Sequence, residues 1–178
     1  MKRYAALLRG VNISGKNKVP MAELRQGLEK LGFSEVKTYL NSGNAVFSGE
    51  DTDTLKLAIL ITEMIHDKFD LDIPVFVISL EELNNILRHA PEWWGSENRE
   101  IYDNLIFIMP PTVSADVYRE IGAPKEGLER IEEYGSAIFW SFSRKDYQKT
   151  NWWSKTAGTV GGRLTIRTAN TVRKIAVL

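Results

Sequence analysis

A short stretch near the start of the chain combines the residue types that bind anions. Residues 9–20 read RGVNISGKNKVP. Cations alternate there with amide and hydroxyl donors and with a glycine that lets a ligand approach the backbone: Arg9, Asn12, Ser14, Gly15, Lys16 and Lys18. Such a loop can hold a phosphate or a carboxylate. The alternative is that the asparagines and glycines only supply turn geometry while the lysines are solvated.

The same stretch departs from the phosphate-binding P-loop, G-x-x-x-x-G-K-[ST]. Asn17 stands where that motif has the hydroxyl that holds Mg²⁺, and Pro20, which suits the first turn of a helix, follows several residues later. A P-loop helix begins at the Gly-Lys step, so that its positive end faces the phosphate. We therefore interpret residues 9–20 as an anion-binding loop of another kind. The G-x-G-x-x-G fingerprint of dinucleotide sites does not occur in the sequence.

Charge is unevenly distributed along the chain, although the formal net charge is zero at pH 7. Residues 1–50 carry eight Lys and Arg against four acids, residues 51–133 carry seven against eighteen, and residues 134–178 carry eight against one, which gives +4, −11 and +7. We predict that the two basic ends converge on one cationic surface. The alternative is that they only complement the acidic middle within the fold.

We expect residues outside the loop to complete the anion site. They come from a tight turn in the first half and from the basic C-terminal block: Asn41, Ser42, Asn44, Lys155, Arg163 and Arg167. A phosphate-bearing small molecule or nucleotide is the ligand that this set would suit. Two alternatives stay open, a nucleic-acid-associated protein and a protein-interaction or homodimerisation module without a ligand.

Aromatic residues near the C-terminal block bear on the nucleic-acid alternative. Residues 149–155 read KTNWWSK, and cations interleaved with tryptophans are typical of single-stranded nucleic-acid binding. We favour the other interpretation, that Trp152 and Trp153 pin a long loop to the core. A net charge of zero also argues against a dedicated nucleic-acid binder.

Residue patterns typical of catalysis are sparse. His66 and His89 are the only histidines, and their spacing is not that of metal ligands. The chain has no cysteine, which excludes disulfides, thiolate ligands and a thiol nucleophile. Ser154 and Lys155 are adjacent, and adjacent side chains seldom converge on each other. We therefore assign no catalytic residue, and we expect neither a metal nor a cofactor.

The elements that must position these residues alternate between strands and helices. In the first half, hydrophobic spacing predicts the order β-α-β-β-α-β over six segments: 4–9, 20–32, 36–40, 45–47, 54–69 and 73–78. After a connecting helix that follows Ser79, the second half repeats a strand, a helix and a hairpin: 104–109, 113–121, 128–133 and 137–142. The hairpins share local sequence, GNAVF against GSAIF, which indicates an internal duplication.

These patterns predict an α+β fold. We expect two ferredoxin-like (split βαβ) subdomains in tandem with antiparallel or mixed sheets, residues 1–79 and 80–178, packed as one compact unit. Arg9 breaks the first apolar run too early for a signal peptide, and no segment reaches the ~18 apolar residues of a membrane span. We therefore expect a cytoplasmic protein without a membrane partner.

The sequence resembles the bacterial DUF1697 family. LLRGVN at 7–12, GKNKVPM at 15–21 and NSGNAVF at 41–47 carry this resemblance, which is close over residues 4–48. It returns near the end, where Ser154-Lys155 and T-x-R followed by N-T-V-x-K resemble the closing segment of the family. Thr168 and Ala169 stand where that segment has Asn and Trp. The resemblance implies a compact α+β fold, no established activity and no catalytic residue.

Overall fold

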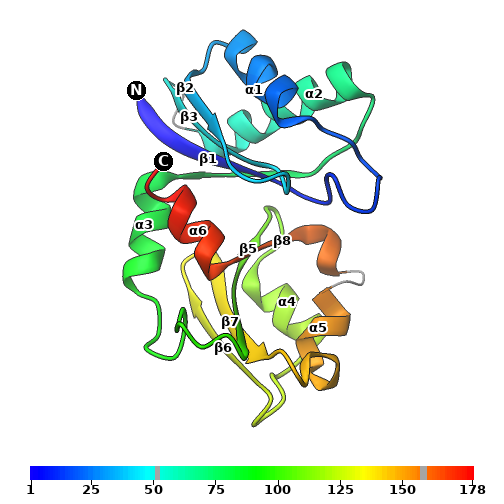
Figure 1. Cartoon of the computed structure of the whole chain (residues 1–178), viewed down its shortest axis with the longest axis vertical. Coiled ribbons are helices and arrows are strands. Elements are labelled where there is room, and N and C mark those ends of the chain that lie inside the picture. The colour runs from blue at the N-terminus through cyan, green and yellow to red at the C-terminus, as the bar shows by residue number, and fades with distance from the viewer. Residues whose placement is uncertain (51–52, 157–159) are drawn as a thin grey trace. The chain divides into compact units, whose positions relative to one another are not determined.

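The computed structural model describes residues 1–50, 53–156 and 160–178, which form two compact units (Figure 1). Unit 1 comprises Met1–Asn84 together with Ile175–Leu178, and unit 2 comprises Asn85–Lys174. The described residues contain six α-helices and two four-stranded antiparallel sheets, so the fold class is α+β as predicted. None of the helices in these ranges is long and apolar enough to span a membrane.

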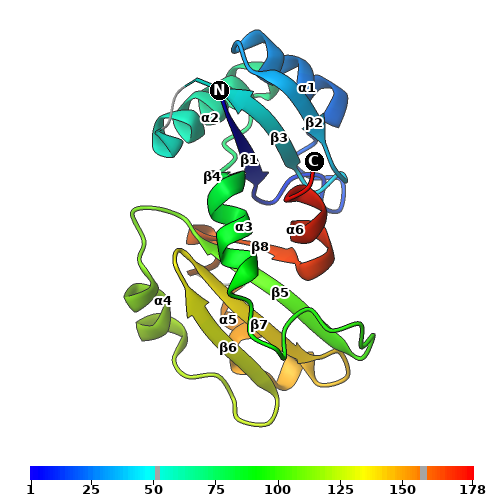
Figure 2. The same ribbon diagram turned by 90° about the vertical axis from the view of Figure 1, so that its left-hand side faces the viewer.

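Unit 1 is an antiparallel sheet with two helices on one face (Figure 2). Its elements are β1 (Lys2–Leu8), α1 (Met21–Lys30), β2 (Ser34–Thr38), β3 (Asn44–Gly49), α2 (Thr54–Phe69) and β4 (Val75–Ser79). The strand order is β2-β3-β1-β4, with β1 paired to both β3 and β4. The side chains of alternate β1 residues point to the helices, where they join one hydrophobic core.

Helix α2 shows how closely the sequence specifies this unit. Its apolar residues recur at helical spacing, and Leu57, Ile61 and Ile65 are buried against the sheet. Asp53 caps the first turn, because its carboxylate accepts hydrogen bonds from two backbone N–H groups. The helix ends at Phe69, and the C-cap residue Asp70 adopts the left-handed conformation at φ 55°. The predicted bounds, 54–69, are confirmed.

Unit 2 contains a second four-stranded antiparallel sheet. Its elements are β5 (Ile101–Ile108), α4 (Ser114–Ile121), β6 (Glu129–Tyr134), β7 (Ala137–Ser143), the short 3₁₀ turns η1 (Tyr147–Lys149) and η2 (Val160–Arg163), α5 (Asn151–Thr156) and β8 (Leu164–Thr168). The strand order is β6-β7-β5-β8. The strands and the two α-helices between them therefore repeat the element order of unit 1. Two further helices are α3 (Leu80–Arg88) and α6 (Ala169–Ile175).

One face of the unit 2 sheet forms a core with α4 and α5 (Figure 1). Trp140 of β7 and Trp152 of α5 are its largest fully buried side chains. We had expected the residues around Trp152 to form a loop, and this expectation was wrong, because residues 151–156 form α5. The helix is only six residues long, too short to show a hydrophobic period in the sequence.

The carboxylate of Glu129 connects α5 to the sheet. Its Oε1 atom accepts hydrogen bonds from the backbone N–H groups of Lys125 at 2.9 Å and Asn151 at 2.7 Å. Its Oε2 atom accepts from the Trp152 backbone at 3.3 Å and from Trp140 Nε1 at 3.1 Å. Only 5% of Glu129 is exposed. A buried acid on β6 therefore caps the first turn of α5 and joins it to β7.

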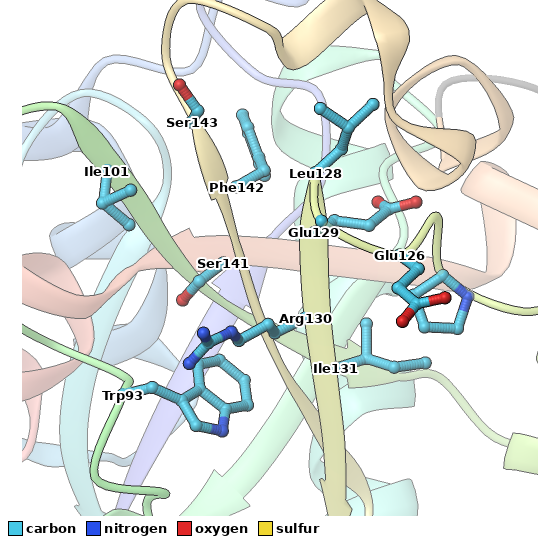
Figure 3. Close-up of a pocket in the computed structure, with 12 residues that line it drawn as sticks. Trp93, Ile101, Glu126, Leu128, Glu129, Arg130, Ile131, Ser141, Phe142 and Ser143 are labelled. Carbon is cyan, nitrogen blue, oxygen red and sulfur yellow. The ribbon is translucent and has the colours of Figure 1, made fainter.

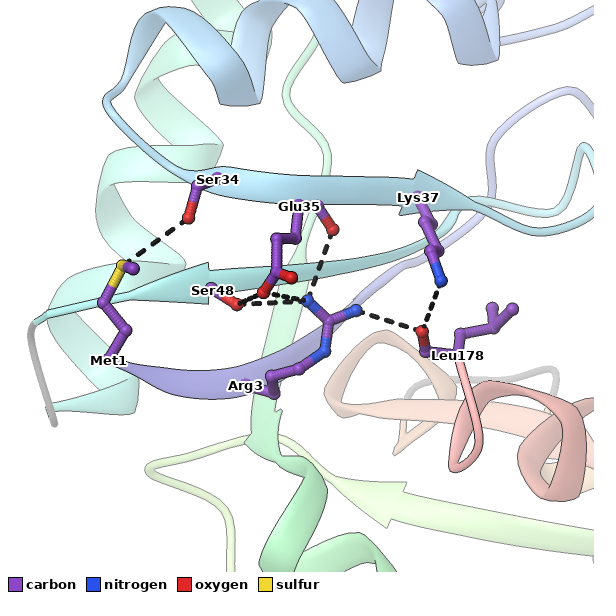
Figure 4. Close-up of polar contacts among 7 residues, drawn as sticks. All are labelled: Met1, Arg3, Ser34, Glu35, Lys37, Ser48 and Leu178. Carbon is purple, nitrogen blue, oxygen red and sulfur yellow. Dashed lines mark hydrogen bonds and ion pairs between the residues drawn. The ribbon is translucent and has the colours of Figure 1, made fainter.

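The last residues of the chain belong to unit 1, whereas we had expected all residues beyond 79 to form the second subdomain (Figure 4). Arg3 Nη2 and Lys37 Nζ donate to the backbone oxygen of Leu178, at 3.2 Å and 2.9 Å. Arg3 also pairs with Glu35, whose pKa is lowered by a hydrogen bond from the Ser48 hydroxyl and by the Arg3 charge. These contacts join the C-terminal segment to strands far from it in sequence.

We predict that Glu129→Gln lowers the free energy of unfolding by about 2 kcal/mol or more. The amide replaces one acceptor oxygen with a donor, so buried N–H groups of α5 or Trp140 lose their partner. Urea denaturation followed by circular dichroism measures the change. Glu132→Gln, at an exposed position of the same strand, is the matched control. Equal stability of the two variants would contradict the role of Glu129.

Candidate anion-binding loop

Residues 9–20 connect β1 to α1 as a loop with a buried base and an exposed tip. Val11 and Val19 anchor its two ends in the core of unit 1. At the tip, the Lys16 backbone N–H donates to the Ile13 carbonyl at 2.9 Å and closes a tight turn. Ser14 and Gly15 lie within this turn and are exposed. The tip is therefore the part of the loop that a ligand can reach.

The side chain of Asn12 holds the two ends of the loop together. Its Nδ2 atom donates to the Val19 carbonyl at 2.9 Å, and its Oδ1 atom accepts from the Val19 backbone N–H at 2.9 Å. The same Nδ2 atom donates to the Asn41 carbonyl at 2.7 Å. The amide of Asn12 therefore positions the loop, and the loop and the Asn41–Asn44 turn are brought together as neighbours.

Left-handed backbone conformations explain the glycines and asparagines of the loop. Gly10, Asn12, Ser14, Gly15 and Asn17 all have φ between 50° and 76°. Glycine adopts this conformation without strain, and asparagine tolerates it better than most residues. The side chain of Asn17 also donates to the Gly10 carbonyl at 2.9 Å. Asn17, at the position of the P-loop hydroxyl, thus stabilises the loop itself.

The turn beside the loop is also held by side-chain hydrogen bonds. Asn44 Nδ2 donates to the Tyr39 carbonyl at 2.8 Å and to Ser42 Oγ at 3.0 Å. The Gly43 carbonyl accepts from the Leu8 backbone N–H at 2.8 Å, which attaches the turn to the end of β1. Asn41 and Ser42 are exposed, and Asn44 is buried. Asn44 therefore acts on the shape of the turn.

The cations of the loop differ in their surroundings. Lys16 and Lys18 are exposed, and their side chains form no hydrogen bond or ion pair with the residues that the structure describes. Arg9 is half-buried, and its backbone N–H donates to the Pro74 carbonyl at 3.0 Å. Helix α1 begins at Met21, five positions beyond Lys16, so the loop lacks the helix terminus of a P-loop.

Two of the C-terminal cations contact the end of α4 in unit 2. Lys155 Nζ donates to the Ile121 carbonyl at 2.8 Å, and Arg163 forms an ion pair with Glu120. Both contacts lie on the helix-bearing side of the unit 2 sheet. These side chains already have partners, which a ligand would have to replace or share.

Arg167 is separated from these two cations within unit 2. It follows Ile166 on β8, and because side chains alternate along a strand it lies on the sheet face away from α4 and α5. Its guanidinium donates to Thr165 Oγ1 at 3.0 Å and to the Ile166 carbonyl at 2.9 Å. Burial lowers the pKa of Arg167 to about 10, so it is charged at neutral pH. That the C-terminal cations share a surface with the loop stays a prediction.

The two tryptophans considered for base stacking have different environments. Trp152 is fully buried, and its Nε1 atom donates to the Gly122 carbonyl at 3.2 Å. A residue in this position cannot stack on a base. Trp153 is 42% exposed and packs edge-on against Phe142 and Tyr147. Trp152 therefore attaches its segment to the core of unit 2, as we expected for both tryptophans, whereas Trp153 lies at the surface beside that core.

Sequence reasoning missed a pocket of about 890 Å³ in unit 2 (Figure 3). Trp93, Ile101 and Arg130 line it together with residues of β7. These residues come from separate segments of the chain and form no motif. In the sequence, only the predicted hairpin of residues 128–142 indicated that some of the lining residues lie on neighbouring strands.

Comparison with known proteins identifies relatives but no activity. A family model described as "Protein of unknown function (DUF1697)" matches residues 1–139. Among solved structures, the chain is similar to the conserved bacterial protein SP0830 from Streptococcus pneumoniae, with 31% identity and a TM-score of 0.86. The alignment covers 99% of this chain and 97% of the other. None of the curated proteins compared with the chain matches it. The resemblance inferred from the sequence is confirmed.

We predict that Gly43→Ala destabilises the protein by about 2–4 kcal/mol. At φ +83° an added Cβ would lie 2.7 Å from both Leu8 Cβ and Val11 Cγ2. Gly10→Ala is the matched control, because its φ is +69° and nothing lies within 4 Å of the added Cβ. Gly10→Ala should cost about 1 kcal/mol, from backbone strain alone. Equal losses in urea denaturation would show that the close packing of this turn contributes nothing.

Proposed function

The chain belongs to the DUF1697 family, and we propose that it binds a phosphate-bearing small molecule or nucleotide at the loop of residues 9–20. The observation that carries this proposal is that different side chains of the loop hold its backbone and are exposed for binding. Asn12 and Asn17 use their side-chain amides on backbone oxygens, whereas Lys16 and Lys18 are exposed beside the tip. The polar residues thus fix a shape, and the cations supply the attraction.

The tip of the loop suits a compact anion for steric reasons. An added Cβ at Gly15 would meet nothing within 4 Å, so the backbone there is open to close approach. A phosphate group can therefore approach the backbone of the turn closely while it interacts with the lysine ammonium groups. The Ser14 hydroxyl, exposed in the same turn, adds a further donor.

Electrostatics favours a phosphate over a single carboxylate. Two lysines lie within three residues of each other on an exposed loop, and a phosphate group carries up to two negative charges near neutral pH. Exposed charges interact through water, so the attraction should fall as salt is added. Nucleotides and phosphorylated metabolites are the small molecules that combine this charge with further groups for the Asn41–Asn44 turn.

We also infer that the two units are tandem copies of one split βαβ arrangement. Their strands and intervening helices follow the same order, and the sheets have equivalent strand orders, β2-β3-β1-β4 and β6-β7-β5-β8. The shared hairpin sequences, GNAVF and GSAIF, fall at β3 and β7, which occupy the same place in their sheets. These agreements support the ferredoxin-like interpretation.

A thermal-shift screen tests the proposed function. We expect the melting temperature to rise with one or more phosphorylated compounds in a panel of nucleotides, sugar phosphates and inorganic pyrophosphate. The double variant Lys16→Ala/Lys18→Ala should lose this rise. Lys30→Ala/Lys56→Ala removes the same charge from exposed positions of unit 1 and should keep it. No rise for any compound, or equal loss in both variants, would refute binding at the loop.

The positioning role of Asn12 can be tested on the same ligand. Asn12→Ala keeps every cation but removes the bonds to Val19 and Asn41. We expect the free energy of unfolding to fall by about 1–3 kcal/mol, because the Val19 N–H loses its acceptor. The affinity for the bound phosphate compound should fall about tenfold, as measured by isothermal titration calorimetry under conditions where the variant is folded. Unchanged affinity would show that the loop shape does not matter for binding.

A further inference from the structure

We propose that the pocket in unit 2 binds a small aromatic carboxylate that also carries an N–H or O–H donor. The pocket has a volume of about 890 Å³ and extends along both faces of the edge strand β6, and the proposed ligand lies on the face that bears Arg130 (Figure 3). The lining residues on this face come from separate segments: Trp93, Ile101, Arg130, Ser141 and Ser143. This site is independent of the anion-binding loop, which belongs to unit 1.

Arg130 supplies the recognition of the carboxylate. Its neighbour Glu129 points into the core, and because side chains alternate along β6, Arg130 lies on the opposite face. Figure 3 shows Arg130 on the same side of the strand as Trp93 and Ser141. The guanidinium is exposed and forms no ion pair or hydrogen bond within the described part of the chain. Its planar fork matches a carboxylate in a bidentate arrangement.

Ser141 and Asp103 supply the acceptor for the donor of the ligand. Arg130, Ser141 and Asp103 are direct partners across β6, β7 and β5, so their side chains form one row on the same sheet face. The Ser141 hydroxyl donates to the Asp103 carboxylate, and both residues are buried. A hydroxyl that gives its proton to a carboxylate presents lone pairs on its other side. It therefore accepts an N–H or O–H from a molecule in the pocket.

Trp93 and Ile101 supply the apolar surface for a flat ring. The Trp93 indole is half-buried and lines the pocket on the side of Arg130. An aromatic ring gains from offset or edge-on contact with an indole as well as from burial of its area. Ile101, at the start of β5, adds an aliphatic wall. An aromatic ring with a carboxylate at one end and a donor at the other can contact all of these groups.

Acidic residues at the same pocket argue against a phosphate ligand. Glu126 and Glu129 line it on the other side of β6 from Arg130 (Figure 3). Among the described lining residues Arg130 is the one cation against two carboxylates, so their summed formal charge is −1. The glutamates repel a dianionic phosphate about twice as strongly as a monoanionic carboxylate, and a single guanidinium can neutralise only the monoanion. The pocket thus selects a ligand class different from that of the loop.

Three related compounds test the proposal. The binding of each is measured by isothermal titration calorimetry and by the shift of the Trp93 indole N–H signal in NMR spectra. 4-Aminobenzoate carries both groups, benzoate lacks the donor, and aniline lacks the carboxylate. We expect 4-aminobenzoate to bind most tightly and to shift the Trp93 signal. The proposal is overturned if benzoate or aniline binds as tightly as 4-aminobenzoate, or if 4-aminobenzoate does not bind at millimolar concentration.

Two variants assign the contacts. Arg130→Gln should weaken 4-aminobenzoate at least about tenfold and leave aniline unchanged, because only the charge-assisted bonds are lost. Arg119→Gln, an exposed arginine of α4 outside the pocket lining, is the control and should bind as the wild type. Ser141→Ala should remove the preference for 4-aminobenzoate over benzoate. Because Arg130 is exposed, we expect Arg130→Gln to fold, so this variant tests the proposal even if Ser141→Ala does not fold. Equal affinity of Arg130→Gln and Arg119→Gln would overturn the proposal.

Discussion

The conformation of the anion-binding loop depends on one asparagine side chain. The amide of Asn12 joins the backbone of Val19 and the carbonyl of Asn41, and so closes the loop at its base while the tip stays exposed. A loop without this closure would have to lose conformational entropy each time it bound a ligand. The hydrogen bonds of Asn12 fix that conformation in the free protein, so the lysines beside the tip are positioned before any ligand arrives.

In unit 2 a carboxylate, that of Glu129, joins separate segments of the chain as the Asn12 amide does in the loop. Glu129 accepts four N–H groups and so joins α5 and Trp140 to β6, in a core where an unpaired acid would be unfavourable. The next residue, Arg130, lies on the other face of the same strand and points into the pocket. Because side chains alternate along β6, Glu129 stabilises the core on one face of the strand while Arg130 is available for binding on the other.

Local patterns predicted most of unit 1 and less of unit 2. The bounds of α2 follow from apolar residues that recur at helical spacing over sixteen residues, which sequence alone displays. Helix α5 is too short for such a signal and is capped by Glu129, twenty-two positions before Asn151, a contact that only the fold creates. The place of Ile175–Leu178 in unit 1 could not be predicted for the same reason, since Arg3 and Lys37 donate to Leu178 across the length of the chain. The sequence identified the loop residues as a group but could not show that Asn12 and Asn17 use their amides within the loop.

The most direct test of the central claim is an NMR titration of the protein with inorganic pyrophosphate at low ionic strength. Binding at the loop predicts that the largest and saturable shifts occur at backbone amides of residues 12–18 and of the Asn41–Asn44 turn, and that they are lost in Lys16→Ala/Lys18→Ala. Shifts scattered over other lysines and arginines without saturation, or no shifts in the loop, would contradict it.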